Sequence, residues 1–114
     1  MPVLRSDGGV VGSLDKEYIR ASIRELVPLV KECYENALLE RPDLGGKLTV
    51  EFSIAGEPEI GGVVAESRIV GTDAGTLHAG LEECVRETMY GLKLEAPAGG
   101  GIVKVRYPFV FRTR

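Results

Sequence analysis

Between residues 14 and 41, apolar side chains recur every three or four positions, the spacing of one face of a helix. The series is Ile19, Ile23, Leu26, Val27, Val30, Tyr34, Ala37 and Leu38. Ser13 is placed to cap the start of this region. Pro28 interrupts the series, so we expect either a kink or two consecutive helices with Pro28 in the first turn of the second. The region ends before Pro42, because the residue preceding a proline avoids helical backbone.

The next segment, from Lys47 to Ile54, alternates between apolar and polar residues as a half-buried strand does. Its apolar face is formed by Leu48, Val50, Phe52 and Ile54, and its polar face by Thr49, Glu51 and Ser53. Residues 55–59 predict a turn, and a weaker alternation predicts a second strand over about 62–69. The two strands are expected to form an antiparallel hairpin with one apolar face.

A helix and a third strand complete the chain. The helix follows residues 71–73 and ends near Gly91, and its apolar face comprises Leu77, Leu81, Cys84, Val85 and Thr88. The strand runs from about Ile102 to Phe111, and its apolar face comprises Val103, Val105, Tyr107, Phe109 and Phe111. Pro108 lacks a backbone donor, so we place this strand at a sheet edge.

The element order is therefore α-β-β-α-β, which predicts an α+β fold of two layers. Helices pack on one face of a three-stranded antiparallel sheet. The length of 114 residues suits one domain. We assign it to residues 13–114 and treat residues 1–12, which show no periodicity, as a flexible lead-in at the end of a linker. No apolar run is long enough to span a membrane, and residues 1–12 lack the features of a secretory signal.

Charge changes this picture at the last strand. The chain carries 14 basic and 17 acidic residues, a net charge of −3 that argues against a nucleic-acid binder. Residues 86–114 nevertheless hold six basic and two acidic groups. The basic excess lies mostly on the last strand, at Lys104, Arg106, Arg112 and Arg114. Two interpretations stay open: an edge strand protected from aggregation by charge, or a partner-facing edge that prefers acidic or carbonyl-rich peptide.

The two cysteines, Cys33 and Cys84, form no C-x-x-C pair and are too few to hold structural zinc. Each lies on the inner stripe of a predicted helix, and both helices must cover the same face of the sheet. Two buried free cysteines and one disulfide closing about fifty residues both fit this arrangement.

Catalytic motifs are absent from the sequence. His78 is expected to be a polar residue on a helix surface. The Gly99-Gly100-Gly101 run precedes a strand, so no helix N-terminus follows it to bind a phosphate. The acidic pairs Glu82-Glu83 and Glu57/Glu59 lie on a helix surface and a turn, with no evident group to separate their pKa values. We predict a protein that is not an enzyme and uses no cofactor or metal.

Several pieces of the sequence together resemble a known family. In chain order they are Gly12–Arg20, Cys33-Tyr34-Glu35 with Leu38, Pro42-Asp43-Leu44 and Gly46 entering Leu48-Thr49-Val50, Cys84, Gly99-Gly100-Gly101, and Tyr107-Pro108-Phe109-Val110-Phe111. In this order they resemble the AgmX/PglI C-terminal domain, a TonB-like module of envelope proteins in myxobacteria and their relatives. One departure is Leu92-Lys93-Leu94-Glu95, where the family usually shows Trp-x-Phe-Pro.

The resemblance implies a TonB-like fold, a periplasmic location and a disulfide between Cys33 and Cys84. It also implies that a membrane anchor and a linker precede this domain in the full-length protein, tethering it to the inner membrane. Relatives are associated with gliding motility and with energy transduction across the envelope. They bind other proteins and turn over no substrate.

We therefore predict a periplasmic protein-interaction domain that couples inner- and outer-membrane components. A free edge on the last strand would bind an extended peptide of an envelope partner as an added strand. The predicted partner-binding residues are Val103, Lys104, Val105, Arg106 and Tyr107. In this prediction Lys104 and Arg106 pair with acidic positions, and pairing stops at Pro108. The same edge could recruit a second copy as a strand-exchanged homodimer. Two alternatives remain. One is a small intracellular α+β domain with reduced cysteines that serves as a regulatory ligand-binding module or an enzyme subunit, and the other is a passive structural spacer.

Overall fold

The computed structural model describes residues 3–4, 10–11, 14–73, 78–97 and 101–112. Its elements in chain order are β1 (Val3–Leu4), β2 (Val10–Val11), α1 (Lys16–Arg24), α2 (Val27–Glu40), β3 (Gly46–Glu57), β4 (Gly61–Thr72), α3 (Ala79–Thr88), the short 3-10 helix η2 (Met89–Gly91) and β5 (Ile102–Phe111). None of the helices in these ranges combines the length and apolar character needed to cross a bilayer.

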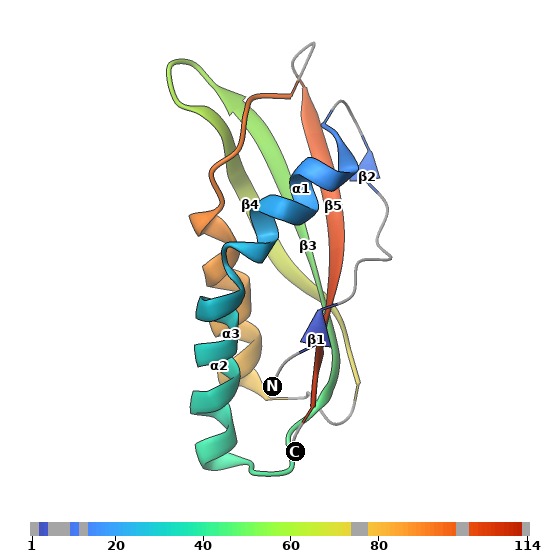
Figure 1. Ribbon diagram of the computed structural model, residues 1–114, viewed down its shortest axis with the longest axis vertical. Coiled ribbons are helices and arrows are strands. Elements are labelled where there is room, and N and C mark those ends of the chain that lie inside the picture. The colour runs from blue at the N-terminus through green and yellow to red at the C-terminus, as the bar shows by residue number, and fades with distance from the viewer. Residues whose placement is uncertain (1–2, 5–9, 12–13, 74–77, 98–100, 113–114) are drawn as a thin grey trace.

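The three long strands form the predicted antiparallel sheet, with β3 between β4 and β5. All three helices lie on one face of it (Figure 1): α1 crosses the sheet obliquely, and α2 and α3 run side by side. The α+β class, the two layers and the element order are confirmed. The first helical region is two helices, with Pro28 in the first turn of α2.

The start of α1 depends on Asp15, whose carboxylate accepts a hydrogen bond of 3.0 Å from the Tyr18 backbone N–H. This side chain satisfies a donor that has no partner within the helix. The cap predicted at Ser13 lies outside the described residues.

The hairpin is longer than its alternation predicts. Residues 55–57, expected in the turn, continue β3 and pair with residues 61–63 of β4. The chain therefore reverses later than the sequence pattern suggests. Gly61, the first residue of β4, has a φ of 115°, a backbone conformation that favours glycine.

The apolar faces predicted for β3 and β5 are buried in one core beneath the helices. In β3 they are Leu48, Val50, Phe52 and Ile54, and in β5 Val103, Val105, Tyr107, Phe109 and Phe111. Tyr34 of α2 joins the layers, because its ring stacks on Phe111 with centroids 4.8 Å apart. Its hydroxyl donates to the Leu44 carbonyl over 2.6 Å. Burial raises the pKa of this hydroxyl.

The N-terminal residues differ from the predicted lead-in. Val3–Leu4 and Val10–Val11 both pair with β5 and so extend the sheet beyond its three long strands. Each segment has only two residues, which is too short to show the alternation by which a strand is recognised. Part of the region 1–12 therefore belongs to the folded domain.

Candidate strand-addition interface

The predicted partner-binding residues form the first half of β5 and divide between the two faces of the sheet. Val103, Val105 and Tyr107 lie in the core, with at most 5% of their surface exposed. Lys104 and Arg106 are exposed on the face that carries no helix. A partner strand at this edge could therefore meet two basic side chains on the open face, while its other face approached the core.

The sequence predicted a free outer edge on β5. In the structure the N-terminal strands occupy part of this edge. Val10 and Val11 pair with Val105 and Lys104, and β1 pairs with residues 109–110. The strand lies at the edge of the three long strands, but two pieces of its own chain cover that edge. Short-range patterns could not reveal this pairing, since it joins residues about a hundred positions apart.

The two N-terminal pairings are separated on β5 by residues 106–108. Pro108 lies in this interval and has no N–H to donate to a neighbouring strand. Between the two pairings, the N-terminal segment has five residues, 5–9, whereas β5 has only three, 106–108. The register of the two pairings therefore differs by two residues. They cannot belong to one regular ladder.

Arg106 shares a carboxylate with a second arginine on the open face of the sheet. Its Nε donates to Glu51 Oε2 over 2.8 Å, and Arg68 donates to Glu51 Oε1 over 2.7 and 3.1 Å. Hydrogen bonds from Arg106 and then Arg68 lower the pKa of Glu51 to about 2. Arg106 was predicted to pair with acidic positions of a partner. It already has an acidic neighbour, although 63% of its side chain remains exposed.

Lys104 differs from Arg106 in this respect. It stands opposite Ser53 of β3 and Val11 of β2, and it makes no ion pair with any residue that the structure describes. Of the two basic residues, Lys104 is therefore the one that lies beside the outer edge of β5 without an acidic partner among the described residues.

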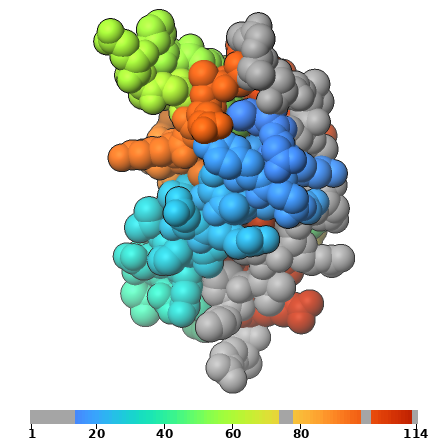
Figure 2. Space-filling model, turned by 45° about the horizontal axis from the view of Figure 1, so that its top comes forward, coloured from blue at the N-terminus to red at the C-terminus, as the bar shows by residue number. Residues whose placement is uncertain are grey.

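The opposite edge of the sheet, on β4, is less suited to accept a strand. Register shifts of the kind that mark β-bulges interrupt β4 at two places, and bulges protect sheet edges from pairing. The segment after η2 covers one end of this edge: the Gly62 N–H donates to the Leu94 carbonyl over 2.7 Å. A Cβ on Gly62 would meet the Glu95 carbonyl oxygen at 2.3 Å, so this close approach requires glycine. Figure 2 shows residues 92–96 lying between the β3–β4 turn and α1.

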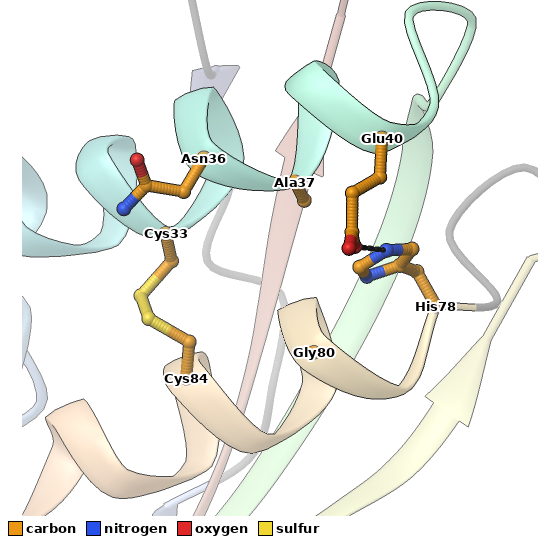
Figure 3. A pocket seen from close by; sticks show the side chains of 7 residues that line it. All are labelled: Cys33, Asn36, Ala37, Glu40, His78, Gly80 and Cys84. Atoms are coloured by element: carbon orange, nitrogen blue, oxygen red, sulfur yellow. Dashed lines mark hydrogen bonds and ion pairs between the residues drawn. A yellow bond between two sulfur atoms is a disulfide. The ribbon is translucent and has the colours of Figure 1, made fainter.

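The two cysteines are joined across α2 and α3, with an S–S distance of 2.04 Å. The disulfide implied by the resemblance is confirmed. It lines a hollow of about 260 Å³ between the two helices, and Glu40 and His78 line it further along (Figure 3). Within the described part of the chain, no cluster of three or more acidic, histidine or cysteine side chains could hold a metal ion.

His78 has a structural role that the sequence analysis did not predict. Its Nδ1 accepts a hydrogen bond of 3.0 Å from the Leu81 N–H, so this side chain caps the start of α3. Because Nδ1 accepts, Nε2 carries the proton and donates to Glu40 Oε1 over 2.8 Å. The ring thus connects the end of α2 to the beginning of α3. Histidine is not a preferred capping residue, so no sequence signal pointed to this role.

Comparison of the chain with family models, with curated proteins and with solved structures yields no match.

Proposed function

We propose that this domain is a non-enzymatic protein-interaction module that binds an extended peptide of an envelope partner. The peptide is added as a strand to the outer edge of β5, at Val103–Tyr107. One observation carries the proposal: this edge already pairs in antiparallel fashion with two extended segments of the same chain. Backbone groups that pair with one strand can pair with another, and backbone pairing provides affinity for an added peptide.

A periplasmic location is part of the proposal, and the disulfide supports it. Disulfides form and persist in oxidising compartments and are rare in the cytosol. The rival, an intracellular ligand-binding module, requires reduced cysteines, whereas Cys33 and Cys84 are bonded to each other. Together with the resemblance to a TonB-like envelope domain, this favours a role in coupling inner- and outer-membrane components, in gliding motility or in transport energy transduction.

The test is a titration of the isotope-labelled domain, followed by NMR, with the synthetic peptide Thr-Val-Glu-Val-Glu-Val-Thr. Paired antiparallel with β5, this peptide can place its two glutamates opposite Lys104 and Arg106. We expect saturable shifts of the Val103–Tyr107 amide signals and cross-strand contacts between peptide and β5. Saturable binding that leaves these amide signals unchanged would show that the site is wrong. Absence of binding at millimolar peptide, both in the parent and in a variant whose β5 edge is uncovered, would contradict the proposed function.

A further inference from the structure

The N-terminal strand β2 and the proposed partner compete for the same backbone groups. Val10 and Val11 pair with Val105 and Lys104, two of the five residues proposed to bind the partner. The β3 side of these residues is also occupied, by Phe52 and Ser53. A strand has only two edges, so a partner cannot pair at Lys104 and Val105 while β2 remains in place.

The resident pairing is small compared with the rest of the sheet. β1 and β2 have two residues each, whereas β3 pairs with all ten residues of β5. Two-residue strands fix few backbone hydrogen bonds, and Pro108 separates the two pairings. Segments with few contacts open at low free-energy cost, so β2 can leave while the three long strands and the helices keep their structure.

The resident strand β2 offers no acidic side chain to Lys104. Its register partner is Val11, an uncharged residue, and no described residue forms an ion pair with Lys104. Opposite charges facing each other across two strands attract. An incoming strand with a carboxylate opposite Lys104 would therefore gain an interaction that β2 cannot provide.

Two observations support an inference: β2 and the partner share pairing positions, and β2 has no acidic residue opposite Lys104. We infer that the N-terminal segment competes with the partner for the β5 edge. A partner strand with an acidic residue opposite Lys104 displaces it. This inference rests on the proposed function and adds to it the charge of the partner and a regulation of the site. The partner's apparent affinity is reduced by the fraction of molecules in which β2 is paired. Anything that draws the N-terminal segment away from β5 would then raise the affinity.

The test compares the full chain with two double variants, using Thr-Val-Glu-Val-Glu-Val-Thr as the probe. Val10→Pro with Val11→Pro removes both backbone donors of β2, whereas Val10→Thr with Val11→Thr keeps them and serves as the matched control. If β2 is paired about ten times as often as it is open, the proline variant binds the probe roughly tenfold more tightly, and the threonine variant binds as the parent does. Unchanged amide signals in β3 and β4 show that the proline variant remains folded.

The charge requirement is tested with Lys104→Gln and with the glutamine peptide Thr-Val-Gln-Val-Gln-Val-Thr. We expect Lys104→Gln to weaken binding of the glutamate peptide and to leave binding of the glutamine peptide unchanged. Equal affinity of the parent for the two peptides would overturn the inference that the partner is acidic.

Two outcomes separate this inference from the function on which it rests. If all variants bind the probe at β5 with one affinity, β2 is no competitor and the proposed function stands. If even the proline variant fails to bind, the proposed function is wrong as well. A dimer of the proline variant joined through β5 would assign the edge to a second copy of this chain. That outcome would overturn the inference that the partner is acidic.

Discussion

At the scale of single residues, Glu51 ties the three long strands together on the open face of the sheet. Its carboxylate lies on β3 and accepts hydrogen bonds from Arg68 on β4 and Arg106 on β5. Only 9% of the Glu51 side chain is exposed, whereas more than half of each arginine side chain is. A polar residue on the outer face is thus buried by its own cross-strand neighbours.

This arrangement predicts how stability depends on pH. The pKa of Glu51 is about 2 in the folded protein and 4.5 for an unperturbed glutamate. Because the folded-state pKa is the lower one, its contribution to stability is fully present above pH 4.5 and is lost as the pH falls towards 2. Thermal unfolding of the parent and of Glu51→Gln should therefore differ most above pH 5 and converge near pH 2.

Glu83→Gln is the matched control for this prediction. The pKa of Glu83 is also lowered, first by a hydrogen bond from Arg86, but this pair lies on a helix surface with 57% of the glutamate side chain exposed. Exposed pairs contribute little to stability, so the loss in melting temperature should be smaller than for Glu51→Gln. Equal losses, or a difference from the parent that persists at pH 2, would contradict the role assigned to Glu51.

At the scale of elements, the start of α3 depends on a side chain that also reaches another helix. His78 caps α3 through Nδ1 and contacts Glu40 of α2 through Nε2. The two contacts can be separated, because asparagine is a good capping residue but is too short to replace the whole imidazole.

We predict that His78→Ala lowers the free energy of unfolding by about 1 kcal/mol, the usual effect of losing a helix cap. His78→Asn should lose less, since it restores the cap without the Glu40 contact. Urea unfolding of the three proteins measures both differences. An alanine variant as stable as the parent would show that the cap contributes nothing, and equal losses in the two variants would assign the effect to Glu40.

For strand β5, the alternation of apolar and polar residues predicts some features of the element and not others. Its bounds and its buried face follow from the alternation over residues 102–111, and the structure confirms both. The pairing of its outer edge with β1 and β2 could not be predicted, because two-residue segments carry no period. Those segments are strands because they pair with β5.

At the scale of the whole molecule, the disulfide joins two helices that are separated in the chain by the entire β3–β4 hairpin. Cys33 and Cys84 are 51 positions apart. Closing so long a loop removes many conformations from the unfolded chain. The bond therefore acts on the stability of the domain as a unit as well as on the contact between α2 and α3.

The expected effect of removing it is large. Cys33→Ala with Cys84→Ala should lower the free energy of unfolding by about 4 kcal/mol, the chain-entropy value for a loop of this length. Denaturant unfolding of the oxidised parent and the double variant measures the difference. Alkylation of the unfolded, unreduced parent should label neither cysteine, which confirms the bond in the sample. A loss below about 1 kcal/mol in a sample whose bond is confirmed would contradict this loop-closure account.

The sequence by itself determined the α+β class, the order of the long elements and the apolar faces of β3 and β5. Each of these follows from a period that neighbouring residues establish and that one buried face enforces. The tertiary structure alone decided the pairing of the N-terminal strands with β5, the burial of Glu51 between two arginines and the contact of His78 with Glu40. Each of these depends on contacts between residues that are distant in the chain, and the periodicity of neighbouring residues does not encode such contacts.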